Sequence, residues 1–402
     1  MTTLNTIVNS MLWAAYGDAL GFITELCDKK TLKYRTNGVN YVTQLIDWKR
    51  KLGGRYGVSI NLPKGCYSDD TQLRLAVCRS IKKDGHFDFE TFSKIEIPVF
   101  LAYSLGMGRA TKVAGESLQK KNIQWNTNFF QTNNSSYING GGNGAAMRIQ
   151  PHIWAASTDT SSFELISEIM RDTIITHGHP IGWVGAVFHG LILHHTLLYK
   201  TCPPPERWME ILDKSKQLVT VCREDQMLKD IWIPTWERLS GITFEQGVSE
   251  AINDISADIK KINLILKNDN HELSPNHNLE KKYQEIVKAI DGFNPKVRGS
   301  ATKTSLLSTY IAHAFSKEPH KGIEICINTL GSDTDTIATM AGAVLGAITE
   351  NDPPQTVMDN QYLINQAKRL YHISCGKSVP QFLYPDLLHW NLPKSSLDQT
   401  GS

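Results

Sequence analysis

Cysteine pairs, an excess of one charge and long apolar runs are all scarce in this sequence. The seven cysteines are scattered over 402 residues and never form a CxxC pair, which argues against a disulfide framework and a zinc knuckle. This usage fits a reducing compartment and predicts a cytoplasmic location. The N-terminal residues lack a basic segment followed by an apolar core, and no apolar run reaches the roughly 18 residues of a membrane span. We therefore expect neither a signal peptide nor a membrane contact.

The charges are nearly balanced, with a formal net charge of +2 and a pI of about 8.1. No basic run and no patch of aromatic residues among basic ones stands out, so nucleic acid is not an expected partner. The hydrophobic content of 41% and the charged content of 20% are ordinary for a globular protein of this length.

Alternating strand patterns and internal repeats are absent as well, whereas apolar residues often recur at i, i+3, i+4 and i+7. The sequence predicts an all-α fold in a single domain over residues 1–395, with surface excursions at about 28–66 and 255–295. Alternatively, residues 255–295 form a separate lobe. Residues 122–142 have the composition of a loop. Helices are expected after two acidic phrases described next and at about 4–20, 90–106, 161–176, 180–199, 206–222, 245–267, 279–290, 303–315, 319–329 and 360–372.

The two acidic phrases stand far apart in the chain: SDDT at residues 68–71 and SDTDT at residues 332–336. Each opens an amphipathic helix and crowds two carboxylates with hydroxyl side chains. Such an all-oxygen set suits hard cations such as Mg²⁺, Mn²⁺ or Ca²⁺, whereas Zn²⁺ and Cu²⁺ favour imidazole and thiolate. If the fold brings the phrases together, they build a two-metal cluster.

The alternative interpretation of each phrase is a simple helix cap. At residues 68–71, a serine cap followed by acidic residues is a common helix start, and both carboxylates can reach a cation at an exposed first turn. The phrase at 332–336 holds more oxygen-bearing side chains than a cap needs. The helix after it is small and apolar almost all round, which predicts a central position. Carboxylates buried there need compensation, and a cation is the simplest one.

Three further phrases carry weaker signals. Residues 140–148, GGGNGAAMR, form a Gly-rich loop that can expose N–H groups to phosphates, with a flexible surface turn as the alternative. Residues 17–21, GDALG, suggest the end of the first helix and a close backbone approach. Glu25 has no special standing by itself. The histidines of THGHP at 176–180 suit capping or hydrogen bonding better than zinc binding.

Together and in this order, these phrases resemble the ADP-ribosylglycohydrolase family. The family pattern of GDxxGxxxE, [ST]DDT, GNGxxMR, TH and GGDTDT is matched by GDALGFITE, SDDT, GNGAAMR, TH and GSDTDT over roughly residues 5–350. Each phrase alone has little specificity, but five in the right order are specific. Two departures are Ser68, where many members have Thr, and Ser332, which replaces a Gly and whose Cβ could crowd the backbone. Neither removes a ligand.

The resemblance implies a compact orthogonal multi-helix bundle around a binuclear centre of two Mg²⁺ ions, with Mn²⁺ as a substitute. By position, the metal ligands are Ser68, Asp69, Asp70, Asp333, Asp335 and Thr336. The catalytic residues are Glu25, Asp70 and Asp335. The residues that match the segments holding ADP-ribose are Gly140, Gly141, Gly142, Asn143, Gly144 and His177. Tyr137, close to the Gly-rich loop, is our candidate for stacking on the adenine.

The function that follows is a metal-dependent hydrolase that releases ADP-ribose from a mono-ADP-ribosylated protein, with arginine as the favoured acceptor. Serine, nucleic-acid and O-acetyl-ADP-ribose linkages stay open. A two-metal phosphohydrolase acting on a nucleotide is a second class, which would release phosphate instead. An immunity protein that blocks an ADP-ribosylating toxin by docking is a third, and it would keep its effect in an Asp70→Asn or Asp335→Asn variant.

Overall fold

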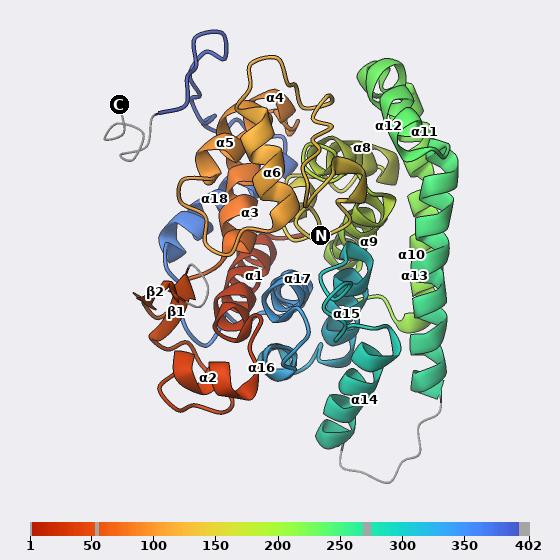
Figure 1. The fold of residues 1–402 in the computed structure, drawn as a ribbon. Coiled ribbons are helices and arrows are strands. Elements are labelled where there is room, and N and C mark those ends of the chain that lie inside the picture. The colour runs from red at the N-terminus through yellow and green to blue at the C-terminus, as the bar shows by residue number, and fades with distance from the viewer. Residues whose placement is uncertain (1, 53–55, 268–274, 394–402) are drawn as a thin grey trace.

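The structure is a computed structural model that describes residues 2–52, 56–267 and 275–393, and it is almost entirely helical (Figure 1). The α-helices are α1 (Leu4–Thr24), α2 (Lys29–Arg35), α3 (Asp69–Ser80), α4 (Phe89–Thr91), α5 (Ile97–Phe100), α6 (Arg109–Leu118), α7 (Gln150–Trp154), α8 (Ser162–Thr173), α9 (Pro180–Tyr199), α10 (Trp208–Asp213), α11 (Gln217–Glu224), α12 (Ile233–Ser240), α13 (Phe244–Lys267), α14 (Pro275–Ala289), α15 (Ala301–Ala314), α16 (Pro319–Asn328), α17 (Thr334–Gly346) and α18 (Asn360–Ser374). The shorter π and 3₁₀ segments are η2 (Phe92–Glu96), η3 (Tyr137–Asn139), η4 (Pro205–Arg207), η5 (Lys214–Lys216) and η6 (Leu228–Trp232). The all-α prediction is confirmed.

Helices α1 and α17 form a closely packed pair at the centre of the fold (Figure 1). Every residue of α17 is buried, as its small apolar composition predicted. The glycines that face the partner helix are Gly17, Gly21, Gly342 and Gly346. A Cβ on Gly21 would lie only 2.4 Å from the Cα of Asp335, and one on Gly346 only 2.4 Å from the backbone oxygen of Asn9. Glycine therefore lets the two backbones approach closely.

The first helix ends later than the sequence predicted. Helix α1 continues through Gly17 and Gly21 to Thr24, so the predicted helix stop is wrong while the predicted close approach is confirmed. The pairing brings the last turns of α1 against the first turn of α17, because Gly21 contacts the backbone at Thr334 and Asp335.

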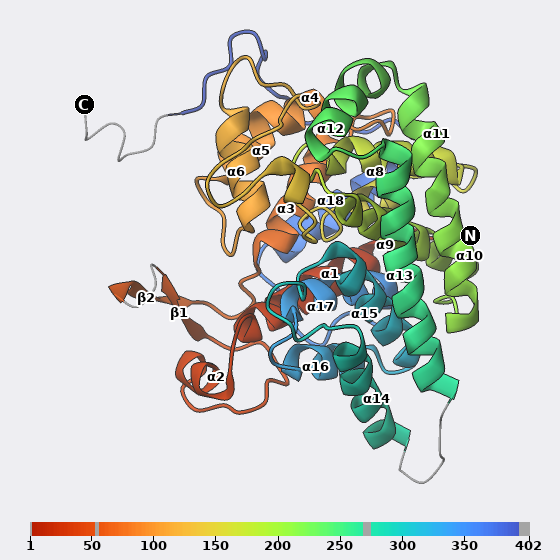
Figure 2. The ribbon, with the colours of Figure 1, turned by 45° about the vertical axis from the view of Figure 1, so that its right-hand side comes forward.

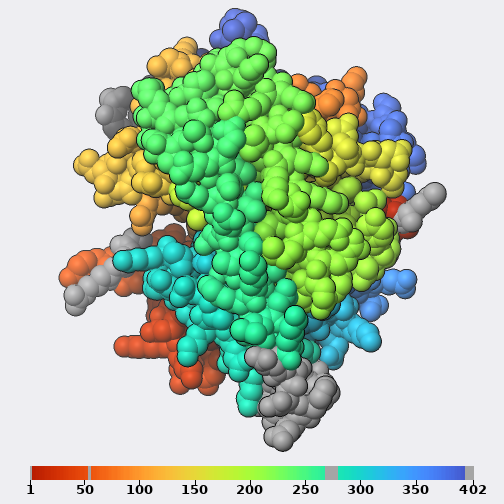
Figure 3. Space-filling model, turned by 90° about the vertical axis from the view of Figure 1, so that its right-hand side faces the viewer, coloured from red at the N-terminus to blue at the C-terminus, as the bar shows by residue number. Residues whose placement is uncertain are grey.

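Helix α9 packs on α15, which in turn packs on α17. By length and composition α9 is apolar enough to cross a membrane, with a mean hydropathy of 1.4, which corrects the expectation that no such segment exists. However, 78% of its apolar window is buried inside the protein, as in a core helix. The long helix α13 and its neighbours cover the outer side of α9 and form the face shown in Figure 3. One domain over residues 1–395 stays a prediction.

The segment 28–66 contains α2 and an antiparallel hairpin of β1 (Trp48–Leu52) and β2 (Val58–Leu62), in which Trp48 pairs with Leu62. The expectation that strands are absent is wrong here. Strand β1 reads WKRKL, so its long basic side chains hide any alternation of apolar and polar residues. The hairpin projects from the body beside α1 (Figure 2).

Two predicted helices are interrupted, and proline explains one of the breaks. The segment 90–106 divides into α4, the π-helical η2 and α5, where Pro98 cannot donate a hydrogen bond to the preceding turn. The segment 206–222 divides at the 3₁₀ turn Lys214–Lys216. Helices α2, α6, α7 and α12 were not predicted. In the predicted excursion 255–295, helix α13 extends to Lys267 and α14 begins at Pro275, while residues 268–274 lie outside the described chain.

Candidate active site

The first acidic phrase forms the N-terminus of α3. The Ser68 side chain caps the helix by accepting a hydrogen bond from the Asp70 N–H at 3.2 Å. The Asp69 N–H donates to the backbone oxygen of Leu105 at 2.8 Å. Asp69 and Asp70 are 6% and 1% exposed, so the expectation of an exposed first turn is wrong. Two carboxylates therefore stand in a buried place.

Asp18 of α1 holds the start of α3 in position. Its carboxylate accepts hydrogen bonds from the Ser68 N–H at 2.9 Å, the Thr71 N–H at 2.8 Å and the Thr71 hydroxyl at 2.5 Å. Asp18 itself is fully buried. Sequence reasoning gave Asp18 no role, although the residue stands inside the GDALG phrase, because its partners lie some 50 positions further along the chain.

The second acidic phrase forms the start of α17 and meets the first. The Thr336 hydroxyl donates to Oδ1 of Asp70 at 3.4 Å across 266 positions of sequence. Asp335 and Thr336 are each 4% exposed, as the burial prediction for this phrase required. Asp333 precedes the helix, and its Oδ2 accepts a hydrogen bond from the Asn143 side chain at 2.9 Å. The fold therefore brings both phrases and the Gly-rich loop together.

The Gly-rich loop lies against His177. A Cβ on Gly144 would lie 3.1 Å from Nε2 of His177, a tight contact that would need the imidazole to shift slightly. His177 is buried, and its Nδ1 lies 2.7 Å from the Thr176 hydroxyl. Burial, with a smaller contribution from the neighbouring Arg148, lowers the pKa of His177 to about 3. The imidazole is therefore neutral at ordinary pH.

The structure narrows the part of the loop that can contact phosphate. Three loop N–H groups already have protein acceptors: Gly140 donates to Tyr137, Gly141 to Asn139 and Asn143 to Gly299. Within residues 140–144, the N–H groups of Gly142 and Gly144 are the two that remain as candidates.

A buried ion pair supports the loop from behind. The Arg148 guanidinium lies 2.8 Å from Oδ1 of Asp172 and donates to the backbone oxygen of Gly144 at 3.1 Å. Neither Arg148 nor Asp172 is exposed to solvent. The arginine of the GNGAAMR phrase therefore has a structural explanation, which sequence reasoning did not provide.

Tyr137 does not offer a ring for stacking. It is 2% exposed, its hydroxyl donates to the backbone oxygen of Ile174 at 2.6 Å, and the same hydroxyl accepts from the Trp232 indole at 2.9 Å. Its ring packs edge-on against Phe129 and Phe130. Tyr137 is a core residue, and the prediction that it stacks on adenine is wrong.

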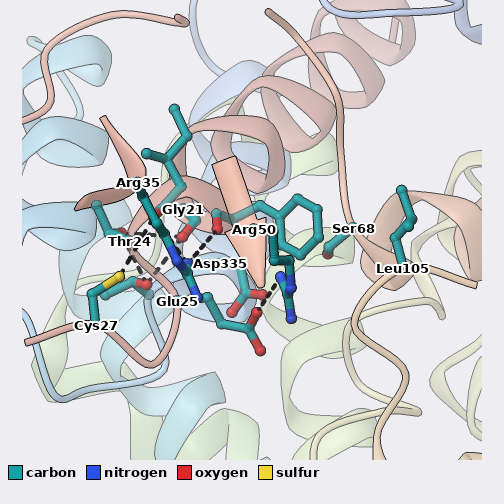
Figure 4. A network of polar contacts seen from close by, with 12 residues as sticks. Gly21, Thr24, Glu25, Cys27, Arg35, Arg50, Ser68, Leu105 and Asp335 are labelled. Atoms are coloured by element: carbon teal, nitrogen blue, oxygen red, sulfur yellow. Dashed lines mark hydrogen bonds and ion pairs between the residues drawn. The ribbon is translucent and has the colours of Figure 1, made fainter. Parts of the chain in front are cut away.

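Glu25 lies at the end of α1 on the border of the acidic cluster. Its Oε2 lies 2.9 Å from Nη1 of Arg50, which comes from strand β1. Figure 4 shows the Glu25 and Arg50 side chains pointing toward one another beside Asp335. Burial raises the pKa of Glu25; Arg50 opposes this shift and Asp333 adds to it. Sequence reasoning missed Arg50, because a basic residue in a basic strand carries no signal of its own.

The electrostatics of the cluster are strongly unfavourable to further negative charge. Burial, and then repulsion from neighbouring carboxylates, raises the pKa of Asp70 well above its ordinary value. The same two causes raise the pKa values of Asp69 and Asp335. Buried carboxylates that repel one another are stabilised either by a bound cation or by taking up protons.

The donor set fits a hard cation. Oδ2 of Asp70 is buried and has no hydrogen-bond partner among the described residues, although a buried carboxylate oxygen normally has one. The surrounding donors are carboxylate and hydroxyl oxygens, the ligands of Mg²⁺ and Mn²⁺. Within residues 2–52, 56–267 and 275–393, no three His, Cys, Asp or Glu side chains already form a coordination group.

An all-α fold in which sequence-distant helix N-termini gather buried carboxylates next to a Gly-rich loop provides a site suited to a hard cation. The chain belongs to the ADP-ribosylglycohydrolase family, whose profile matches residues 1–376.

Two curated relatives share part of the sequence. The chain is 24% identical to ADP-ribosylhydrolase ARH1 of Dictyostelium discoideum over 234 residues, which cover 54% of this chain and 55% of that protein. It is 27% identical to the ADP-ribosyl-[dinitrogen reductase] glycohydrolase of Rhodospirillum rubrum over 192 residues, 47% of this chain and 57% of the relative. The matched segments thus span about half the length of these relatives.

A solved structure shares the fold. The chain aligns with an ADP-ribosylglycohydrolase-related protein complex with a TM-score of 0.53 and 17% identity, over 92% of this chain and 98% of the other. At this identity the likeness concerns the fold alone.

Proposed function

We propose that this protein is a metal-dependent hydrolase that releases ADP-ribose from a mono-ADP-ribosylated protein by cleaving the N-glycosidic bond to arginine. One observation carries the proposal: the two acidic phrases meet in a buried cluster where Oδ2 of Asp70 has no hydrogen-bond partner among the residues that the structure describes. Family membership supports the hydrolase class, and the name of the Rhodospirillum rubrum relative supports a protein substrate.

The metal ligands in this proposal are those named from the sequence. Ser68, Asp69, Asp70, Asp333, Asp335 and Thr336 would hold two Mg²⁺ ions, with Mn²⁺ as a substitute. Bound ions would supply Lewis acidity near the ribose and would neutralise the mutual repulsion of the carboxylates.

The remaining residues bind the substrate and move the proton. Cleavage of the ribosyl C1–N bond develops oxocarbenium character. Glu25 takes a proton from the attacking water, whose oxygen bonds to C1, and the proton ends on the nitrogen of the departing guanidine. The raised pKa of Glu25 suits a group that both takes and releases a proton. The Gly142 and Gly144 N–H groups and Nε2 of neutral His177 bind the diphosphate and the neighbouring ribose.

A cytoplasmic location stays part of the proposal. All seven cysteines are free thiols and only Cys375 is exposed, which suits a reducing compartment. The comparisons lend no support to docking on a toxin.

The test is to incubate the protein with an arginine-linked ADP-ribosylated protein and to measure free ADP-ribose and phosphate by chromatography. We expect ADP-ribose release that requires Mg²⁺ and stops with EDTA. Asp335→Asn should reduce release at least about 100-fold, because even outer-shell partners of metal sites contribute 10- to 100-fold. Asp28→Asn, which changes an exposed helix cap, is the matched control and should retain activity.

The other outcomes separate the alternatives. Release of phosphate in place of ADP-ribose would assign the site to a phosphohydrolase. ADP-ribose binding without release would move the proposal to another linkage. Release that persists in EDTA would contradict the metal dependence.

A further inference from the structure

The guanidinium of Arg50 is held on two sides. Its Nη1 lies 2.9 Å from Oε2 of Glu25, and its Cζ lies over the Phe22 ring at 4.4 Å from the ring centre. A carboxylate at the edge and an aromatic ring below the plane are the two contacts that a guanidinium favours. The Arg50 side chain is 13% exposed and that of Glu25 is 14% exposed, so the contact is largely shielded from water.

A glycine also lies next to the planar group. Gly106 has a φ of +96°, and a Cβ there would lie 2.9 Å from Oδ1 of Asp69 and 3.4 Å from the Phe22 ring. The same Cβ would lie 3.8 Å from Nη2 of Arg50. Gly106, Phe22 and Glu25 therefore border one slot, which Arg50 fills.

Arg50 does not take the place of the metal. It counteracts the raised pKa values of Glu25 and Asp69, whereas the carboxylates of Asp70 and Asp335 are affected chiefly by burial and by other carboxylates. The guanidinium thus lies on the Glu25 side of the acidic cluster, where the proposed reaction places the departing guanidine.

The strand that carries Arg50 belongs to the projecting hairpin (Figure 2). At its base, Trp48 is buried and packs edge-on against Phe22 at 5.1 Å. Beyond Arg50, the side chains of Leu52 and Val58 are 43% and 71% exposed. The end of the hairpin beyond Arg50 is therefore more exposed than its base at Trp48.

We propose that Glu25 and Phe22 form a guanidinium-binding subsite, and that Arg50 occupies it as an intramolecular substitute for the acceptor arginine, which the substrate displaces. This inference rests on the proposed function in naming the acceptor, and it adds the residues that recognise it. Arg50 then lowers the affinity for arginine-linked substrates and excludes weakly bound guanidinium compounds.

The binding test uses methylguanidinium as the probe and needs neither metal nor turnover. Titration followed by NMR should show at least tenfold tighter binding to Arg50→Ala than to the unchanged protein. Arg50→Lys, which keeps the charge but loses the planar fork, should fall between the two. Lys49→Ala is the matched control: it removes a positive charge from the same strand, and its side chain points to the opposite face.

A second step shows where the probe binds. Adding Glu25→Gln to Arg50→Ala should remove the gain, because the subsite then lacks its carboxylate. Equal binding by Arg50→Ala and Lys49→Ala, with both variants folded by circular dichroism, would overturn the inference.

Kinetics separate this inference from the proposed function. With an arginine-linked substrate, Arg50→Ala should lower KM several-fold. A drop in kcat with unchanged KM and no gain in methylguanidinium binding would show that Arg50 only orients Glu25. Tighter methylguanidinium binding without any ADP-ribose release by either protein would keep the subsite and overturn the proposed reaction. ADP-ribose release by the unchanged protein, with no gain in methylguanidinium binding by Arg50→Ala, would keep the proposed reaction and overturn the subsite.

Discussion

At the scale of single residues, two buried histidines make the stability of the protein depend on pH. Burial lowers the pKa values of His177 and His189 from 6.5 to about 3. The unfolded chain therefore binds more protons than the folded protein between these values, so the free energy of unfolding falls as the pH falls from about 6.5 toward 3. Each histidine should contribute up to about 1.4 kcal/mol per pH unit.

Urea denaturation at a series of pH values measures this dependence. The prediction is that His189→Gln, whose Nε2 lies 3.0 Å from the Gln150 amide, flattens the slope by about one proton. The same slope in this variant and in the unchanged protein would contradict the assignment. His177 lies against the Gly-rich loop, so His189 is the cleaner choice.

Single site residues could be predicted from the sequence where they belong to a motif. They could not be predicted where only contacts in the folded protein define their role. The acidic phrases carry an unusual density of oxygen donors, and their meeting through Thr336 and Asp70 was predicted. Arg50 acts through partners that follow no periodicity, and nothing in its neighbourhood marks it. Asp18 stands inside the GDALG phrase, but its partners at the start of α3 cannot be identified from that phrase alone. Tyr137 was chosen for closeness in sequence, which says nothing about burial.

At the scale of elements, the α1–α17 contact positions the second acidic phrase. A Cβ on Gly21 would lie 2.6 Å from the backbone oxygen of Thr334 and 2.4 Å from the Cα of Asp335. Gly21→Ala should therefore push the start of α17 away and lower the free energy of unfolding by about 1–3 kcal/mol, the usual range for overpacking. It should also weaken the stabilisation by Mg²⁺, measured by thermal unfolding.

Two other glycines serve as controls for this prediction. Gly346→Ala meets the backbone of Asn9 at 2.4 Å at the other end of the same contact, so it should destabilise the fold while leaving the Mg²⁺ effect intact. Gly108→Ala has nothing within 4 Å and should change neither. If Gly21→Ala and Gly346→Ala respond alike to Mg²⁺, the contact does not position the site.

Helices with one clear pattern of apolar residues could be predicted from the sequence. Helix α9 was predicted at 180–199 and is found at Pro180–Tyr199, because most of its residues are apolar and Pro180 marks its first turn. The π turn before Pro98 and the 3₁₀ turn at Lys214–Lys216 depend on which backbone carbonyl accepts each N–H hydrogen bond, and the pattern of apolar residues does not determine this. The hairpin was missed because pairing between strands, and not the pattern within β1, determines it.

At the scale of the whole molecule, the site joins segments that lie far apart in the sequence. The end of α1, the starts of α3 and α17 and the Gly-rich loop meet there through hydrogen bonds that span up to 266 positions. The repelling carboxylates oppose this meeting. Removing one of them should relieve the repulsion, and binding a cation should relieve it more completely.

Thermal unfolding of Asp70→Asn tests this coupling. In EDTA, the variant should melt at or above the temperature of the unchanged protein, because one buried charge of the repelling cluster is gone. With Mg²⁺ at 100 times its dissociation constant, the unchanged protein should gain about 2.7 kcal/mol, and the variant little or nothing. Equal stabilisation of both proteins by Mg²⁺ would place the ion elsewhere and leave Oδ2 of Asp70 unexplained.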